Sequence, residues 1–333
     1  MNVFIKGISY YLPEKVLTNE DLIMEFPEWS VEKVTAKIGI SQRHIAGENE
    51  TASDMAVIAG ANLINEYKID KESIDFVLLC TQSPDYFLPA SSCLIQERLG
   101  LRTNIGALDF NQGCSGFIYG LSLAKGLICA GIASNVLLLT SETYSKHIHL
   151  KDKGNRTIFG DAAAATLVST TGFSEIGEFS LGTDGRGAGN LIVETGGLRS
   201  KDMKNILEWD ENGNPLSPDN LYMNGSEIFN FTIDTVPQLI KDTLSKNGLS
   251  HEEIDLFVLH QANKFILEFL RKKLKIDQEK FFYFLENVGN TVSSTIPIAL
   301  KEAINEGQIS EGRNCLIAGF GVGYSWGGTV LKF

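Results

Sequence analysis

Residues 72–82 read ESIDFVLLCTQ, and residues 253–261 read EIDLFVLHQ. Each segment places an Ile-Asp pair before a short apolar run of strand length, and a helix-length segment follows both. A shorter echo accompanies them, NVLLLT at 135–140 and NCLIAG at 314–319. A motif that recurs in the second half of a chain is typical of an internal duplication. We therefore expect two copies of one β/α unit, fused in tandem.

Outward from these segments, apolar runs of strand length alternate with helix-length segments, which is typical of an α/β fold with buried strands. We predict strands at Phe76–Cys80, Ile105–Phe110, Asn135–Thr140 and Ala162–Ser169. We predict helices at about Ala52–Tyr67, Ser91–Leu99 and Ser115–Ala130. The two halves, residues 1–172 and 173–333, should share one interior. The stretch Gly182–Asn224, rich in Gly, Asn, Asp and Pro, should form a surface excursion or a lid.

The composition excludes several classes of function. With 43% hydrophobic and 21% charged residues, the chain is that of a soluble globular protein. A net charge of −12 argues against a nucleic acid as the main partner. No apolar run approaches the ~20 residues of a membrane span, so we expect none. The five cysteines have no metal-ligand spacing, which predicts a reduced, cytoplasmic setting and no bound metal.

Cys114 is the first candidate for chemistry. It stands in LDFNQGCSGF at 108–117, where a strand of the buried type turns directly into an apolar helix. Backbone N–H groups and the helix dipole at such a place favour a thiolate and should lower the pKa of the thiol. A nucleophile that attacks a thioester needs this property. A small packing residue of the core is the alternative for a cysteine before a helix.

His260 and Asn290 are the candidates in the second half. His260 ends the predicted strand of the repeat, so its imidazole should emerge at the carboxyl edge of the sheet, where open α/β sheets bind ligands. Asn290 lies in NVGNTVSS at 287–294, in a turn before the predicted helix Thr295–Asn305. Taken singly, His260 has a structural alternative and Asn290 is most simply a helix cap. The duplication predicts that Cys114 and these two residues meet.

Four motifs strengthen this constellation: CSGF at 114–117, HQAN at 260–263, GNT at 289–291 and GFGVGYSWG at 319–327. In their order and approximate spacing they resemble β-ketoacyl-ACP synthase III enzymes, and the likeness extends from about Met1 to Phe333. The resemblance implies a thiolase-like α/β fold, in which two duplicated βαβ halves pack as α-β-α-β-α layers.

The resemblance also implies a two-step reaction without cofactor or metal. Cys114 would accept an acyl group from an acyl-CoA or acyl-ACP primer. Malonyl-ACP would then lose carbon dioxide and attack as an enolate, while His260 and Asn290 donate hydrogen bonds to the thioester carbonyl. The oxyanion of acyl transfer would lie against the N–H groups of Cys114 and Val322. A homodimer is expected.

Other positions match the residues with which the family contacts its substrates less closely. Trp29 matches a tryptophan that clamps the adenine of coenzyme A, but Lys37 and Lys153 stand where the family has arginines, and lysine offers no planar stacking surface. Arg156 is either a substitute or part of a surface salt bridge. Leu88 matches a position that reaches across the dimer to bound the primer pocket, and an ordinary interface contact is the alternative. From the motifs themselves, Asn263 and Phe320 are also expected at the substrate.

A basic patch completes the expected site. Its members follow the HQAN motif and are Lys264, Arg271, Lys272 and Lys273. They form either a docking surface for an acyl carrier protein or a solvated helix face.

Two rival functions remain on the sequence. An acyltransferase of the same fold would pass the acyl group from Cys114 to an alcohol or amine. A non-catalytic subunit of a larger synthase would need no nucleophile, and the intact set of three residues argues against it. Asn111-Gln112-Gly113, which differs from the small residues usual before the nucleophile, points to a specialised role in polyketide, lipid or surface-glycan metabolism.

Overall fold

A ten-stranded sheet runs through the whole molecule in the computed structural model, which describes residues 1–211 and 213–333. Its strands from the front half are β1 (Phe4–Tyr11), β4 (Phe76–Cys80), β5 (Gly106–Phe110), β6 (Asn135–Glu142) and β7 (Ala162–Ser169). Its strands from the rear half are β8 (Ser174–Ile176), β9 (Ser180–Thr183), β14 (Leu256–Leu259), β15 (Asn314–Gly321) and β16 (Ser325–Lys332). The strand order is β14-β15-β16-β8-β1-β7-β6-β4-β5, and β9 pairs with β16.

Strand β8 joins two half-sheets, because it pairs with β1 on one side and with β16 on the other. In each half, the strand of the repeated motif has a parallel neighbour: β4 pairs with β5 and β6, and β14 pairs with β15. Parallel strands present their carboxyl ends at one edge, where sites form. The boundary that we propose between residues 172 and 173 lies directly before β8.

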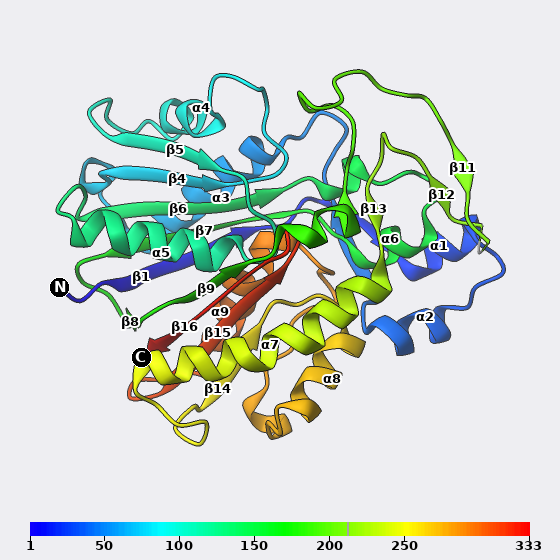
Figure 1. The fold of residues 1–333 in the computed structure, drawn as a ribbon. Coiled ribbons are helices and arrows are strands. Elements are labelled where there is room, and N and C mark those ends of the chain that lie inside the picture. Colours follow the sequence, from blue (N-terminus) through cyan, green and yellow to red (C-terminus); the bar gives the residue numbers. More distant parts are fainter. Residues whose placement is uncertain (212) are drawn as a thin grey trace.

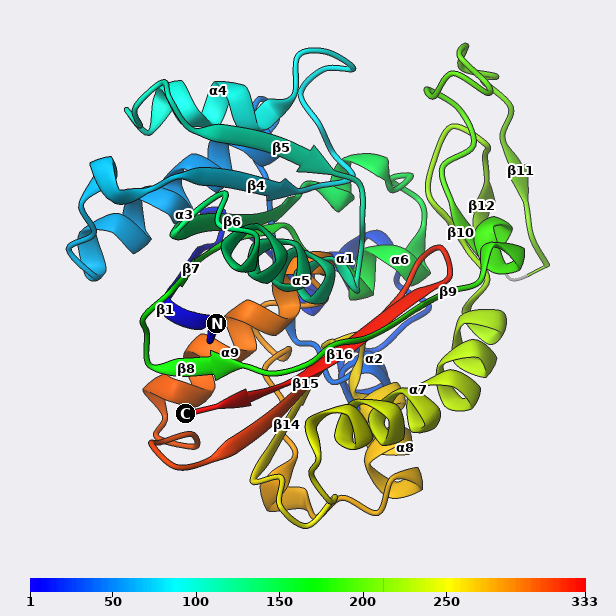
Figure 2. The same cartoon turned by 60° about the vertical axis from the view of Figure 1, so that its left-hand side comes forward.

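Helices cover both half-sheets and also separate them (Figure 2). Those on the outer face of the front half-sheet are α3 (Ala52–Glu66) and α4 (Ser91–Arg98). Those between the half-sheets are α5 (Gly116–Cys129) and α9 (Thr295–Asn305). Those on the outer face of the rear half-sheet are α7 (Gly225–Asn247) and α8 (Lys264–Lys273). The α-β-α-β-α layering predicted from the sequence is confirmed.

The middle layer lies in an apolar core to which both halves contribute. Phe117 of α5 and Ile296 of α9 belong to one buried cluster with Leu78 of β4 and Ile317 of β15. Helix α5 is apolar on most of its surface because strands of both half-sheets pack against it. This packing fixes the positions where the two central helices begin.

Smaller elements gather at one side of the sheet (Figure 1). They are β2 (Lys15–Thr18), α1 (Asn19–Glu25), α2 (Val31–Ile38), β3 (Gln42–Ile45) and α6 (Lys153–Ile158). The short 3₁₀ helices are η1 (Lys71–Ser73), η2 (Tyr144–His147), η3 (Gly185–Asn190), η4 (Gln278–Lys280) and η5 (Val292–Ser294). Among residues 1–211 and 213–333, none of the helices has the length and apolar character that a bilayer span requires.

The stretch Gly182–Asn224 projects from this side as an arm (Figure 1), as the predicted excursion requires. Residue 212, within it, lies outside the described residues. The arm contains two small antiparallel pairs, β10 (Leu191–Ile192) with β13 (Tyr222–Met223), and β11 (Glu208–Trp209) with β12 (Pro215–Leu216).

Candidate active site

Cys114 lies in the turn between β5 and α5, two residues before the helix begins, and its side chain is 5% exposed. Burial raises the pKa of the Cys114 thiol to about 12. Hydrogen bonds from the backbone N–H groups of Val322 and Cys114 lower the pKa, but their effect is smaller. The sequence predicts a lowered pKa, and the structure reverses that direction. The physical reason is that the rear half encloses the helix start and removes the water that would solvate a thiolate.

The end of β15 and the loop that follows it close over this sulfur. A side chain at Gly321 would place its Cβ 2.7 Å from the Cys114 Sγ, so only glycine fits there. The hydroxyl groups of Ser115 and Ser325 lie 2.7 Å apart and join the start of α5 to the start of β16. These contacts between the halves hold the Val322 N–H beside the sulfur, which is the arrangement that the predicted oxyanion hole needs.

His260 follows β14 directly, and its side chain is 2% exposed. Its backbone N–H donates to the Ala318 carbonyl at 2.8 Å, and its ring Nδ1 lies 2.7 Å from Thr295 Oγ1. The Phe320 ring packs perpendicular to the imidazole, with a centroid separation of 5.9 Å. Burial lowers the pKa of His260 to about 3, so the imidazole is neutral near pH 7. Among the described residues, the ring's hydrogen bond is the one at Nδ1, and Nε2 has no partner.

Asn290 lies in the turn before α9, next to Gly289, whose φ is 72°. Its N–H donates to the Ile158 carbonyl at 2.9 Å, and its carbonyl accepts the Gly160 N–H at 3.0 Å, so the front half holds its backbone on both sides. Its Oδ1 accepts the Val292 N–H at 2.9 Å. Because this bond fixes the amide, Nδ2 is the end left to donate.

Val292 links these groups through one backbone segment. Its N–H donates to Asn290 Oδ1, and its carbonyl oxygen lies 3.0 Å from Thr295 Oγ1, which also lies 2.7 Å from His260 Nδ1. Its φ of 55° is left-handed, which a β-branched residue rarely adopts and which is often found at functional sites. Val292 and Cys114 belong to one buried cluster. Asn290 and His260 are therefore linked through this segment, and Cys114 belongs to the same buried cluster as Val292.

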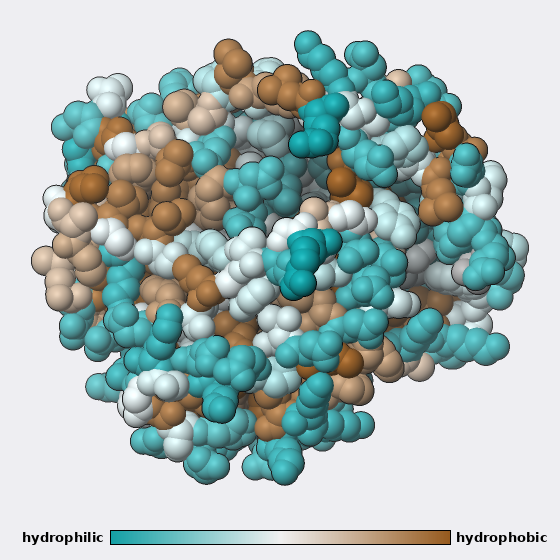
Figure 3. Space-filling model, in the orientation of Figure 1, coloured by the Kyte–Doolittle hydropathy of each residue, from teal (hydrophilic) through white to brown (hydrophobic). Residues whose placement is uncertain are grey.

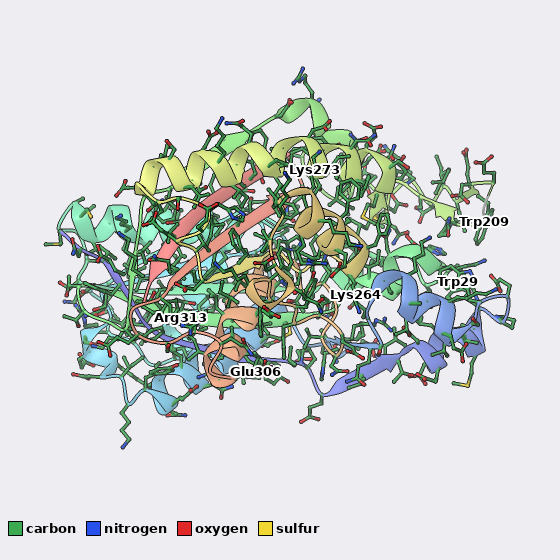
Figure 4. The ribbon with its side chains drawn as sticks, turned by 90° about the horizontal axis from the view of Figure 1, so that it is seen from below. Trp29, Trp209, Lys264, Lys273, Glu306 and Arg313 are labelled. Atoms are coloured by element: carbon green, nitrogen blue, oxygen red, sulfur yellow. The ribbon has the colours of Figure 1, made fainter. Side chains whose placement is uncertain are left out.

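A cavity of about 440 Å³ opens beside the predicted substrate residues Trp29, Lys37 and Asn263. It also touches Ile158, whose carbonyl accepts the Asn290 N–H, but Cys114, His260 and Asn290 are not among the residues that line it. The other residues that line it are Glu28, Ser30, Lys33, Val34, Ile38, Gly154, Thr157 and Phe265. Figure 4 shows Trp29 beside α2 and Lys264 at the start of α8, on the same side of the molecule.

The remaining predicted substrate residues are placed differently. Lys153 forms an ion pair with Glu28, and Arg156 binds Glu25 at 2.7 Å, so carboxylates neutralise both cations beside the cavity. For Arg156 this matches the salt-bridge alternative. Phe320 packs on His260, as described above. Leu88 is 83% exposed, between β4 and α4, and is not among the residues that line the cavity.

Sequence reasoning missed Thr295 and Glu142. The sequence marks Thr295 only as the first residue of a predicted helix, and nothing local shows that its hydroxyl contacts a histidine 35 residues earlier. Glu142 follows the predicted strand Asn135–Thr140, yet it is fully buried and accepts the Gln82 N–H at 2.9 Å. Burial raises the pKa of Glu142 well above its usual value, and its charge would in turn oppose a thiolate at Cys114.

Comparisons with known proteins agree with this architecture. The family model described as 3-oxoacyl-(acyl-carrier-protein) synthase III matches residues 108–185, and the model of the C-terminal part of that family matches residues 244–333. A β-ketoacyl-(acyl-carrier-protein) synthase III of Clostridium perfringens is 37% identical over 332 residues, with 99% of each chain covered. A crystal structure of a 3-oxoacyl-(acyl-carrier-protein) synthase III is 47% identical, with both chains fully covered and a TM-score of 0.97. The corresponding structure from Thermus thermophilus is 34% identical, with 99% of each chain covered and a TM-score of 0.87.

Proposed function

The chain belongs to the 3-oxoacyl-(acyl-carrier-protein) synthase III family, and from that premise we propose that Cys114, His260 and Asn290 carry out a decarboxylative condensation. Cys114 attacks a primer thioester, becomes acylated and releases the carrier thiol. A malonyl thioester then loses carbon dioxide, and its enolate attacks the acyl group. The 3-oxoacyl thioester leaves, and the Cys114 thiolate takes up a proton.

The observation that carries this proposal is a pair of free donor positions on the rear half. Within residues 1–211 and 213–333, Asn290 Nδ2 and His260 Nε2 are left without a protein partner, while the opposite end of each side chain is anchored by Val292 or Thr295. Donors fixed in advance stabilise the charge that develops on the enolate oxygen. Because decarboxylation supplies the carbanion, a neutral imidazole is sufficient and no strong base is needed.

The cavity between Trp29 and Ile158 supports the proposed substrates. It would admit the phosphopantetheine arm that an acyl-CoA or acyl-ACP primer shares with malonyl-ACP. Glu25 and Glu28 neutralise the cations Arg156 and Lys153 beside it, so Lys37 is the predicted cation that remains for a phosphate. A reduced, cytoplasmic setting stays part of the proposal and is supported by the five free cysteines.

A carrier protein would dock on α8. The predicted patch consists of Lys264, Arg271, Lys272 and Lys273. Arg271 binds Glu268 at 3.0 Å, and Lys273 donates to the Ile233 carbonyl at 2.7 Å, so both have partners within the chain. Lys272 also pairs with Glu268, at 4.0 Å, but its side chain is exposed, so Lys264 and Lys272 are better placed to meet an acidic partner. Figure 3 shows a largely hydrophilic surface along the edge where α7 and α8 lie.

A homodimer through the edge of β5 is the proposed assembly. Strand β5 ends the sheet, and its Leu108 is exposed, as are Tyr86, Phe87 and Leu88 in the loop before α4. An open strand edge flanked by apolar side chains favours pairing with another chain. In such a dimer Leu88 would bound the primer pocket of the partner. Light scattering of the purified protein measures the assembly directly.

Intact-mass measurement tests the reaction. The protein is incubated with acyl-CoA and acyl-carrier donors and then with a malonyl thioester. We expect His260→Ala to take up the acyl group but to form no 3-oxoacyl product, because it loses a donor used only in the second step. Normal product formation by this variant would contradict the assigned role. A product without two added carbons would instead support the acyltransferase, and a wild-type protein that is never acylated would support the non-catalytic subunit.

A further inference from the structure

Thr295 has no assigned part in the reaction, yet it is buried beside one of the proposed catalytic groups. It is the first residue of α9 and is 3% exposed. Its Oγ1 lies 2.7 Å from His260 Nδ1 and 3.0 Å from the Val292 carbonyl oxygen. The Thr295 hydroxyl is therefore a polar group that positions the Nδ1 edge of the imidazole.

The hydroxyl has a single proton and two neighbours that can accept it. If the proton goes to the Val292 carbonyl, Nδ1 must carry its own proton, and Nε2 of a neutral imidazole is then bare. If the proton goes to Nδ1, Nε2 carries the proton of the ring. The direction of the Thr295 hydroxyl proton therefore determines whether His260 Nε2 is a hydrogen-bond donor or an acceptor towards the substrate.

The proposed condensation, on which this inference rests, requires a donor at Nε2. The shorter of the two contacts of Thr295 is the one to Nδ1. We propose that Thr295 is a positioning residue, whose hydroxyl donates to Nδ1 of His260 and so holds the Nε2–H tautomer towards the thioester oxygen of the extender. Partners of this kind fix the tautomer and ring orientation of functional histidines elsewhere.

Further contacts hold the ring and the neighbouring amide in fixed positions. Burial holds His260 neutral, so only one ring nitrogen carries a proton. The ring cannot turn freely, since Phe320 packs perpendicular to it and its backbone is tied to Ala318. Asn290 is held in the matching way, with Oδ1 anchored by Val292 and Nδ2 left to donate. Both donors of the site would then be aimed by one turn, residues 290–295.

Two variants separate this role from a purely structural one. Thr295→Ser keeps the hydroxyl, and Thr295→Val keeps the shape of the side chain without it. In ¹⁵N-histidine NMR, with His260→Ala to identify the resonances, we expect a protonated Nε2 and a hydrogen-bonded, unprotonated Nδ1 in the wild type and in Thr295→Ser. In Thr295→Val the Nδ1 resonance should move towards that of a nitrogen without a hydrogen bond. Thermal unfolding shows whether each variant is folded.

Half-reactions supply the second readout. Starting from acylated Cys114, Thr295→Val should condense about tenfold more slowly or worse, the effect of losing one orienting hydrogen bond, whereas Thr295→Ser stays close to the wild type. Acylation should be unchanged in both variants. A wild-type proton on Nδ1, or condensation at the wild-type rate by Thr295→Val, would overturn the inference. Wild-type protein that fails to acylate or condense would instead refute the proposed function, whatever the tautomer of His260. If Thr295→Val does not fold, the NMR spectrum of the wild type still shows which ring nitrogen of His260 carries the proton.

Discussion

The ends of β4 and β14 are built alike but finish with different residues. Asp75 N–H donates to the Asn135 carbonyl before β4, and Asp255 N–H donates to the Asn314 carbonyl before β14, each at 2.9 Å. At the other end of the strands, Cys80 occupies the position in the repeat that His260 occupies in the second copy. The Cys80 thiol is enclosed and donates to the Gln112 carbonyl at 3.1 Å, whereas His260 keeps Nε2 open.

The turns before the two central helices correspond in the same way. Residues 111–114 read NQGC and precede α5, while residues 287–290 read NVGN and precede α9. Cys114 and Asn290 thus hold matching positions, each in the turn before a central helix. The comparison teaches that duplication supplies the geometry twice, and that single residues decide which of the four positions performs chemistry.

The largest expected effect concerns the two cysteines, because acylation of Cys80 would contradict the contrast between the two strand ends. We expect Cys114→Ala to take up no acyl group, because the nucleophile is removed, and we expect Cys80→Ala to acylate like the wild type. Intact-mass spectra after incubation with acyl thioesters measure both. Equal labelling of wild type and Cys114→Ala would remove the nucleophile from the proposed position.

The second turn is tested by Asn290→Asp, which keeps an oxygen for the Val292 N–H but replaces the free donor by an acceptor. Condensation from acylated Cys114 should fall by about 100-fold or more, the scale of losing an oxyanion donor. Acylation should be spared, and product formation is followed by mass spectrometry. An equal loss in both half-reactions would place Asn290 in the acylation step instead.

The pH dependence of Cys114 sharpens the contrast between an enclosed and an exposed thiol. Since burial raises the pKa of Cys114 to about 12, the thiolate fraction grows with pH throughout the neutral range. Alkylation by iodoacetamide should therefore accelerate about tenfold per pH unit without levelling off. Peptide mass spectrometry separates Cys114 from the exposed Cys93 and Cys129, which serve as controls. A plateau near neutral pH would mean that the site stabilises the thiolate.

The smallest expected effect concerns the two aspartates of the repeat. Asp75 accepts the N–H groups of Ser134 and Asn135 and also pairs with Arg102, whereas Asp255 accepts the Asn314 N–H. Asp75→Asn should lower the free energy of unfolding by about 1 kcal/mol and Asp255→Asn by less, because the first also loses an ion pair. Urea unfolding measures both; the reverse order would show that the two copies are not braced in the way their contacts suggest.

Much of this scaffold was predictable because it depends on local patterns. The predicted strand Phe76–Cys80 and the predicted helix Thr295–Asn305 have the observed ends. The predicted helix Ser115–Ala130 is one residue longer at each end than α5. Apolar runs, glycine turns and the repeat are all contained in short stretches of chain, so they reveal the elements and place Cys114, His260 and Asn290 at their ends.

The rest depends on contacts between distant segments. The burial that raises the pKa of Cys114 comes from a loop of the rear half, and Lys153 and Arg156 meet carboxylates more than 100 residues away. The left-handed backbone of Val292 gives no signal either, since valine is an unfavourable residue for it. Composition and spacing do not encode such pairings.

The peptide segment at Val292 has one further consequence. Its N–H anchors Asn290 and its carbonyl contacts the threonine that holds His260, so these two side chains share a mechanical support. Energetic effects of substitutions on the two sides should consequently not add, since a shift of this segment displaces both at once. In any redesign of this pocket, Asn290 and His260 should therefore be treated as one unit.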